Sequence, residues 1–308
     1  MIIQHQRRLH QFLFLVVVVV LLTASRASAQ LDPLYAQYFN TPILINPAFT
    51  GMHNRWVSSA GYRGQWTGLE GAPNTMNFNS HISLRNNTLG AGIMFLSDRI
   101  GENRNKEFNA LMSYRIELNE GVLSFGMQAG MMQFSSNSAG VVLRDPSDPK
   151  FATFNEFKFN TGAGLVYQTD KYMFGLSVPR LLNNDITLGT TTIQVYDRHY
   201  YVIGSYTLPI SARLKMVPTV LLKATKANPI SADINANIVI DDIYTAGICT
   251  RNLNSFGLTC TMRVKNYRFG YIFEVPGSNP GTAFTTHEVT MALGIPIFNY
   301  HEKIFQKF

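Results

Sequence analysis

The chain has 308 residues, a formal net charge of +7 at neutral pH and only 15% charged residues. A water-soluble protein of this length has about 25% charged residues, and a nucleic-acid-binding protein carries a concentrated basic excess. The composition therefore argues against a soluble protein and against nucleic acid as a partner. With 21 Phe, 14 Tyr and 23 Gly, it favours a protein that exposes aromatic side chains to lipid.

Residues 1–29 predict a cleaved signal peptide. A basic pair is followed by an apolar run over residues 12–22, and Ala27-Ser28-Ala29 forms a small-x-small cleavage site. An uncleaved transmembrane anchor is the alternative, but a membrane span needs about twenty apolar residues. We therefore expect export, with cleavage after Ala29 and a mature chain of about +4, since three of the basic residues lie in the leader.

Residues 30–54 predict an ordered arm rather than a strand. Proline shifts the residue before it away from helical geometry, and Asn or Asp side chains bond to the backbone that follows them. The arm could fold into a lumen as a plug, or it could lie along a periplasmic rim as a surface for a partner. The candidate plug or partner-binding residues are Tyr35, Tyr38, Phe39, Asn46, Pro47, Phe49 and Gly51.

Residues 55–296 break into about fourteen segments of alternating polarity, the pattern of an all-β transmembrane antiparallel barrel. In residues 231–238 the apolar side chains occupy even positions and the polar ones odd positions. Successive side chains of a strand point to opposite faces, so one face meets lipid and the other a wet lumen. A period of two residues excludes helices. Similar segments occur at residues 77–85, 89–96, 109–116, 123–131, 157–167, 267–274 and 289–293.

The connections between these segments alternate in length, which is typical of outer-membrane barrels with short periplasmic turns and longer outside loops. We place in the periplasm the tight turns at residues 86–87, 119–121, 170–171, 209–211, 241–242 and 265–266. We place outside the longer connections at residues 67–73, 99–106, 135–155, 180–197, 224–229 and 276–286, with one short exception near 252–254. Residues 297–308 form a C-terminal tail.

Alternation also directs a set of charged side chains into the lumen. The main candidates are Arg63, Arg115, Asp233, Arg268, Glu274 and Glu288, accompanied by His81, Arg85, Lys158 and Arg263. Buried charges are costly unless they are paired or solvated. We expect mutual ion pairs that hold the barrel, whereas a role in gripping a ligand or selecting solutes is the alternative.

Two cysteines in an exported chain invite a disulfide. Cys249 and Cys260 fall on adjacent predicted strands, but alternation puts Cys249 on the wet face and Cys260 on the lipid face. Side chains on opposite faces cannot approach to the roughly 4 Å between Cβ atoms that a disulfide requires. Both thiols should be free.

No catalytic, cofactor-binding or metal-binding pattern is recognisable. The histidines show no HExxH spacing, and there is no Gly-x-Ser-x-Gly elbow. The glycine pairs in residues 90–92 and 162–164 lack the third glycine and following helix of a dinucleotide loop, so they predict close approaches within strands.

A series of motifs resembles one family over nearly the whole mature chain. The motifs are Asp32-Pro33, Gln37-Tyr38, Asn46-Pro47-Ala48-Phe49-Thr50-Gly51, Tyr62-Arg63, Gln65-Trp66, Gly71-Ala72-Pro73-Asn74-Thr75, Asp98, Ile100-Gly101, Arg198-His199-Tyr200-Tyr201, Leu214-Lys215, Pro218, Lys223 and His287-Glu288. In this order they are similar to the PorP/SprF family, outer-membrane proteins of the type IX secretion and gliding machinery.

The resemblance implies a non-enzymatic protein of the outer membrane. Such a barrel would contact outer-membrane lipid and dock periplasmic type IX secretion components, or it would bind secreted proteins with C-terminal sorting domains and retain them at the cell surface. A passive channel for small solutes is the rival hypothesis.

Overall fold

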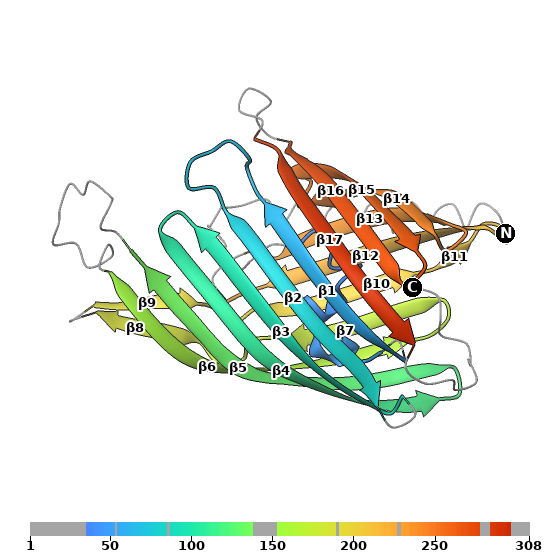
Figure 1. The fold of residues 1–308 in the computed structure, drawn as a ribbon, viewed down its shortest axis with the longest axis horizontal. Coiled ribbons are helices and arrows are strands. Elements are labelled where there is room, and N and C mark those ends of the chain that lie inside the picture. The colour runs from blue at the N-terminus through green and yellow to red at the C-terminus, as the bar shows by residue number, and fades with distance from the viewer. Residues whose placement is uncertain are drawn as a thin grey trace, which may run out of the picture.

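The computed structural model describes residues 35–52, 54–84, 87–137, 153–188, 191–226, 229–277 and 284–296. Fourteen of the described strands form one closed antiparallel barrel, in which β1 pairs with β17 and β10 pairs with β12 (Figure 1). The all-β barrel expected from the sequence is confirmed. The barrel strands are β1 (Arg55–Gly64), β2 (Asn74–Leu84), β3 (Leu89–Ile100), β4 (Asn103–Leu118), β5 (Gly121–Ser136), β6 (Phe154–Gln168), β7 (Tyr172–Val178), β10 (Tyr200–Tyr206), β12 (Leu214–Ala224), β13 (Ser231–Ile240), β14 (Tyr244–Arg251), β15 (Ser255–Val264), β16 (Tyr267–Pro276) and β17 (Thr286–Pro296).

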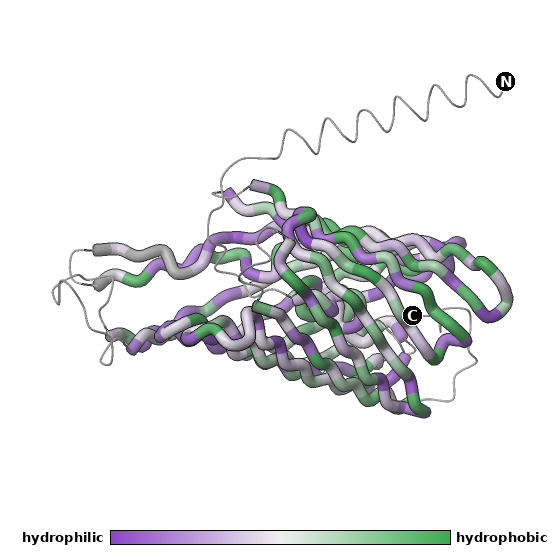
Figure 2. Tube along the Cα trace, turned by 90° about the horizontal axis from the view of Figure 1, so that it is seen from above, coloured by the Kyte–Doolittle hydropathy of each residue, from purple (hydrophilic) through white to green (hydrophobic). Residues whose placement is uncertain are grey.

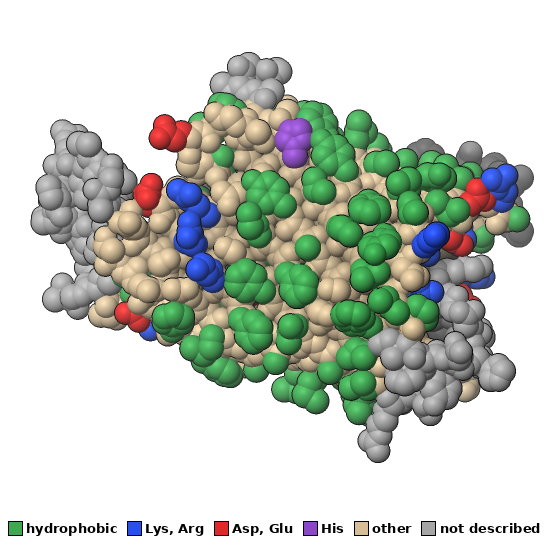
Figure 3. Space-filling model, viewed as in Figure 1, with side chains coloured by type: hydrophobic (Ala, Val, Ile, Leu, Met, Phe, Trp, Pro, Cys, Tyr) green, Lys and Arg blue, Asp and Glu red, His purple; other side chains and the backbone are tan. Residues whose placement is uncertain are grey.

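Side chains alternate between the lumen and the outer wall, as the period of two predicts. In β13, Asp233 and Asn235 are buried, whereas 43% of Ile234 and 42% of Ile238 is exposed. Hydropathy alternates along the strands in Figure 2, and Figure 3 shows hydrophobic side chains spread over the outer wall. The wall is thus a lipid-facing surface, because a water-soluble barrel would carry polar residues there.

The two rims of the barrel differ. The short-turn rim carries the six predicted tight turns and both ends of the barrel chain, where Arg55 of β1 pairs with Pro296 of β17. Several of its turn residues have positive φ, which Asn and Asp tolerate well: Asn87, Asp241, Asp242 and Lys265. The opposite rim carries the other connections. Successive connections alternate between the two rims along the chain. Locating one rim on the periplasmic or the outer side therefore also locates the other.

One expectation for the opposite rim is wrong. Residues 99–106 were expected to form a long connection, but β3 continues to Ile100 and β4 begins at Asn103, so the link is a tight turn that uses the positive φ of Gly101. The polar residues in this stretch resemble a loop in the sequence. In the structure they belong to strands that extend beyond the apolar part of the outer wall. The long connection expected at residues 180–197 is present between β7 and β10, and it contains a hairpin of β8 (Asn184–Leu188) and β9 (Thr191–Tyr196).

Several strands are longer than the sequence patterns indicated, notably β4, β5 and β6 with 16, 16 and 15 residues. A two-residue strand, β11 (Leu208–Pro209), extends the pairing of β12 at the short-turn rim. The leader, the C-terminal tail and Arg85 lie outside the described residues. The described residues contain no helix with the length and apolarity of a membrane span.

The cysteine expectation is confirmed, because both thiols are free, Cys249 is buried and Cys260 is exposed. Their partners in the ladder also differ, with Cys249 opposite Gly257 and Cys260 opposite Ala246.

The rims give a test of sidedness that does not depend on loop length. We expect a protease site inserted in the turn between β14 and β15, at residues 252–254, to be cut on intact cells, because it lies on the opposite rim. The same site in the turn at residues 241–243, which is equally short but on the short-turn rim, should be cut only after the outer membrane is opened. Immunoblotting reads both results, and the reverse pattern would invert the topology.

Candidate functional site

The arm lies inside the barrel and fills the middle of the lumen. It contains two short 3-10 helices, η1 (Pro42–Leu44) and η2 (Pro47–Phe49), drawn in blue within the ring of strands in Figure 1. Only 1% of Tyr38 and none of Ala48 is exposed. The aromatic and aliphatic side chains of the arm form one buried cluster with inward residues of the wall, including Leu111, Val166 and Ile203.

The first part of the arm bonds to the carboxylate of Glu288 on β17. The backbone N–H groups of Ala36 and Gln37 donate to the two Glu288 oxygens at 2.8 and 3.1 Å. The Gln37 side-chain oxygen accepts a hydrogen bond from Thr290 at 2.6 Å. Hydrogen bonds to an ionised acceptor are stronger than neutral ones, so Glu288 is a strong anchor for the arm.

Glu288 belongs to an ion-pair cluster in the lumen near the opposite rim. Arg63 bridges Glu274 at 2.5 Å and Glu288 at 3.0 Å. Next to them, Asp233 pairs with two cations, Lys223 and Arg251, each at 3.0 Å. The cluster is balanced, with three cations against three carboxylates, so no uncompensated charge is buried. Removal of a single member would leave one, at a cost of about 3–5 kcal/mol.

Tyr38 joins the arm to the second half of this cluster. Its hydroxyl donates to the backbone oxygen of Asp233 at 3.3 Å and accepts from the Asn235 side chain at 2.5 Å.

The Asn-Pro-Ala motif packs against β5, β6 and β7. The Asn46 oxygen caps η2 by accepting from Ala48 N–H at 2.9 Å, while its NH₂ group donates to the carbonyl oxygens of Leu165 and Leu176, both at 3.1 Å. Pro47 occupies the first position of the 3-10 helix, where no N–H is needed. One amide thus caps the helix and binds two wall strands, a combination that only an Asn-sized side chain supplies here.

Two wall glycines make room for this motif. A Cβ on Gly126 would lie 2.1 Å from the Ala48 nitrogen, and a Cβ on Gly164 would lie 2.0 Å from the Asn46 side-chain oxygen. These distances are far below van der Waals contact, so the arm approaches the wall through gaps left by missing side chains. Gly164 belongs to one of the glycine pairs that the sequence assigned to close approaches.

The last part of the arm is held by Arg115 and by the left-handed turn at Gly51. Arg115 Nη1 donates to the Thr50 carbonyl oxygen at 2.8 Å, and its Nη2 donates to the Leu89 carbonyl at 2.7 Å. Gly51 has φ of +66°, and its N–H donates to His81 Nδ1 at 2.9 Å. Gly51 therefore adopts a backbone conformation that residues with a side chain rarely adopt.

The predicted lumen charges form two separate sets. Arg63, Asp233, Glu274 and Glu288 meet in the ion-pair cluster. Lys223 and Arg251 complete it, and neither was among the candidate lumen charges, although alternation places Arg251 on the wet face. Arg115 and Arg268 do not join it. They donate to arm carbonyls, Arg268 to Asn40 at 2.8 Å, and neither has a carboxylate partner among the described residues. Gln37 and Gly126 were not among the candidate site residues, although Gln37 stands in one of the family motifs.

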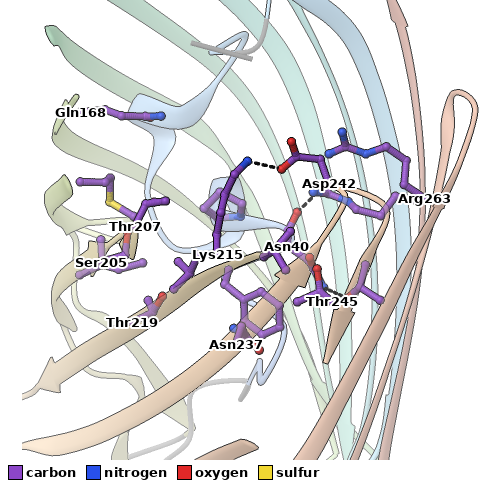
Figure 4. Close-up of a pocket in the computed structure, with 18 of the residues that line it drawn as sticks. Asn40, Gln168, Ser205, Thr207, Lys215, Thr219, Asn237, Asp242, Thr245 and Arg263 are labelled. Carbon is purple, nitrogen blue, oxygen red and sulfur yellow. Dashed lines mark hydrogen bonds and ion pairs between the residues drawn. The ribbon is translucent and has the colours of Figure 1, made fainter. Parts of the chain in front are cut away.

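Between the arm and the short-turn rim the lumen opens into a cavity, which we call the vestibule (Figure 4). It holds about 140 Å³ of water-accessible space. Apolar side chains of the arm and wall line one part of it, namely Phe39, Phe49, Met173 and Ile203. The charged lining consists of Lys215, which pairs with Asp242, and of Arg263 and Arg268. The vestibule is therefore amphipathic with an excess of positive charge.

The opposite mouth is narrowed by the β8–β9 hairpin. Ile186 and Tyr196 of this hairpin pack on the inward side chains Met132 and Phe134 of β5. Arg180, at the start of the same connection, pairs with Glu107 at 2.7 Å and lies 4.8 Å from the centre of the Tyr196 ring. Among the described residues, no group of three or more His, Cys, Asp or Glu side chains is placed to hold a metal ion.

Comparison with known proteins identifies both a family and a fold. A family model described as "Type IX secretion system membrane protein PorP/SprF" matches residues 27–293. No curated protein matches the chain.

The chain resembles the solved structure of the Pseudomonas putida toluene transporter TodX, with 10% identity, a TM-score of 0.50, and coverage of 84% of this chain and 94% of TodX. The monoaromatic hydrocarbon channel CymD is similar at 11% identity and a TM-score of 0.50, with 88% and 95% coverage. At these identities the likeness establishes the outer-membrane barrel fold alone.

The wall glycines provide a test of the plug. We expect Gly126→Val to displace the arm, because the added side chain overlaps Ala48; overpacking of this kind costs about 1–3 kcal/mol. The variant should lose heat stability in a gel-mobility assay and gain conductance in a planar bilayer. The matched control is Gly204→Val, where the nearest atom to an added Cβ is 4.0 Å away. Equal conductance of the two variants would contradict the inference that the packed arm closes the lumen.

Proposed function

The chain belongs to the PorP/SprF family of type IX secretion system membrane proteins, and from that premise we propose that it is a closed barrel that docks a periplasmic component of the secretion machinery. Membership makes it an outer-membrane β-barrel component of that system and implies a non-enzymatic role. The proposal concerns what the barrel does there.

The observation that carries the proposal is the plug. The arm contacts strands around the ring, from β17 and β13 through β6 and β7 to β4 and β2, so it crosses the whole lumen. A solute channel needs a continuous wet path, which this arrangement interrupts. The closed lumen favours docking over the passive channel.

The vestibule supplies a place for a partner. It lies at the short-turn rim, which in outer-membrane barrels faces the periplasm. Its apolar lining and the Arg268 side chain, which has no carboxylate partner among the described residues, suit a protruding segment with apolar and acidic residues. Charge complementarity of this kind selects partners and speeds their association. We therefore assign the vestibule to a periplasmic secretion component.

Retention of secreted cargo at the cell surface is the second candidate. It is favoured by the uneven wall, in which the 16-residue strands β4 and β5 contrast with the eight residues of β14. Together with the β8–β9 hairpin, these strands extend one side of the opposite rim. Such a wall could hold a C-terminal sorting domain, since loops on a rigid scaffold commonly carry recognition.

Filling the vestibule tests the docking proposal. Thr219 is an inward residue of β12 in the vestibule lining, whereas the next residue, Val220, points outward with 39% of its side chain exposed. We expect Thr219→Trp to reduce co-purification of the periplasmic partner at least about tenfold, as expected when a central contact region is blocked. Secretion should fall with it, while Val220→Trp leaves both unchanged.

Heat-modifiable gel mobility establishes that both variants fold. Normal co-purification and secretion with Thr219→Trp would refute docking in the vestibule. If the periplasmic partner stays bound while cargo is lost from the cell surface of a β8–β9 deletion, cargo retention becomes the better assignment.

A further inference from the structure

Three cations form a compact group on the outer wall at the opposite rim, which we call the rim cation cluster. It consists of Arg99 on β3 and of Arg104 and Lys106 on β4. Arg99 lies directly opposite Arg104 in the antiparallel register, and Lys106 lies two residues along β4 on the same face. Figure 3 shows Lys and Arg side chains grouped at one end of the hydrophobic outer wall.

Alternation establishes that the cluster faces outward. Asp98 precedes Arg99 in β3, and Glu107 follows Lys106 in β4. Both are only 3% exposed and point into the lumen, where Asp98 bonds to Thr75 and Glu107 to Arg180. On the outward face, the next pair of residues toward the middle of the wall is apolar. It consists of Phe95 opposite Phe108, and both rings are exposed. The cations therefore follow directly after the lipid-facing band.

The depth of the cluster corresponds to lipid headgroups. Lys106 and Arg104 lie two and four residues beyond Phe108 on the same face of β4. A strand rises about 3.3 Å per residue, and barrel strands tilt by about 40°, so the charges lie on the order of 5–10 Å beyond the last ring row. That is the layer in which the acyl chains give way to phosphate groups.

Within the protein the cluster is not neutralised. Like charges directly opposite each other in a sheet are destabilising. Arg99 donates to the Gly101 carbonyl oxygen at 3.2 Å, and none of the three cations forms an ion pair among the described residues, the neighbouring turn carboxylate of Glu102 included. At the short-turn rim the exposed cation Arg213 pairs with Asp241, and the half-buried Lys215 pairs with Asp242.

We propose that Arg99, Arg104 and Lys106 bind the phosphate groups of an outer-leaflet glycolipid. The proposal rests on the opposite rim being outside, and it is independent of the docking function. Two guanidinium groups side by side offer the planar donor geometry that matches phosphate oxygens, and the ammonium of Lys106 adds a third charge. A bound phosphate would also remove the repulsion between Arg99 and Arg104.

The test measures binding of lipid A to the full mature barrel in a neutral detergent. Native mass spectrometry should detect bound bis-phosphorylated lipid A, and a titration should give its affinity. Surface cations contribute about fivefold each, so Arg99→Ala/Arg104→Ala/Lys106→Ala should weaken binding roughly 100-fold. The charge-preserving variant Arg99→Lys/Arg104→Lys/Lys106→Arg should bind with an affinity between those of the unmodified barrel and the triple alanine variant, because it keeps the charges and loses the paired guanidinium planes.

A matched control removes two cations from the short-turn rim, Lys171→Ala/Lys265→Asn, and should bind as the unmodified barrel does. Dephosphorylated lipid A should bind as weakly as bis-phosphorylated lipid A binds to the triple alanine variant. The proposal is overturned if dephosphorylated lipid A binds as well as bis-phosphorylated lipid A, or if the triple alanine variant keeps full affinity. It is also overturned if inorganic phosphate competes at the lipid's own concentration, because that result would indicate a site for free anions. Heat-modifiable mobility of each variant shows that the barrel is folded in every comparison.

Discussion

Closure of the hydrogen-bonded ring is the constraint on which the rest of the structure depends. In lipid every backbone N–H and C=O must be satisfied within the protein, and a closed barrel achieves this without an edge strand. Closure through β1–β17 and β10–β12 also encloses a lumen whose wall is lined by polar side chains. Those side chains then need partners of their own, because water is excluded where the arm packs.

The arm and the wall satisfy each other. The Glu288 carboxylate accepts bonds from Arg63 on β1 and from two arm N–H groups, so one side chain joins the ring closure to the plug. Arg115 and Arg268 similarly donate to arm carbonyls instead of to carboxylates. The lumen charges thus act mainly as internal ligands for a segment of the same chain, which explains how a barrel of this width can hold so many of them without being an open pore.

The two surfaces of the barrel use charge differently. Inside, the cluster around Arg63 and Asp233 is balanced and buried, so its energy comes from close pairing. On the outer wall the strand register places the exposed Arg99 and Arg104 together with the half-buried Lys106, and these cations have no ion-pair partner among the described residues. The vestibule and the rim cation cluster lie at opposite rims, so the two proposed contacts, with a periplasmic component and with lipid phosphate, do not compete for the same surface.

The sequence by itself determined the strands, their lumen and lipid faces, the free cysteines and the division into two rims, because all of these follow from a period of two and from local turn chemistry. It also identified the arm as a non-strand segment through its Asp32-Pro33 and Asn46-Pro47 steps. Only the tertiary structure decided that the arm lies in the lumen, that Glu288 meets Arg63 across 225 positions, and that residues 99–106 continue as strands. The reason is physical: alternation assigns a side chain to a face, but its partner on that face depends on strand stagger and on which segment fills the enclosed space.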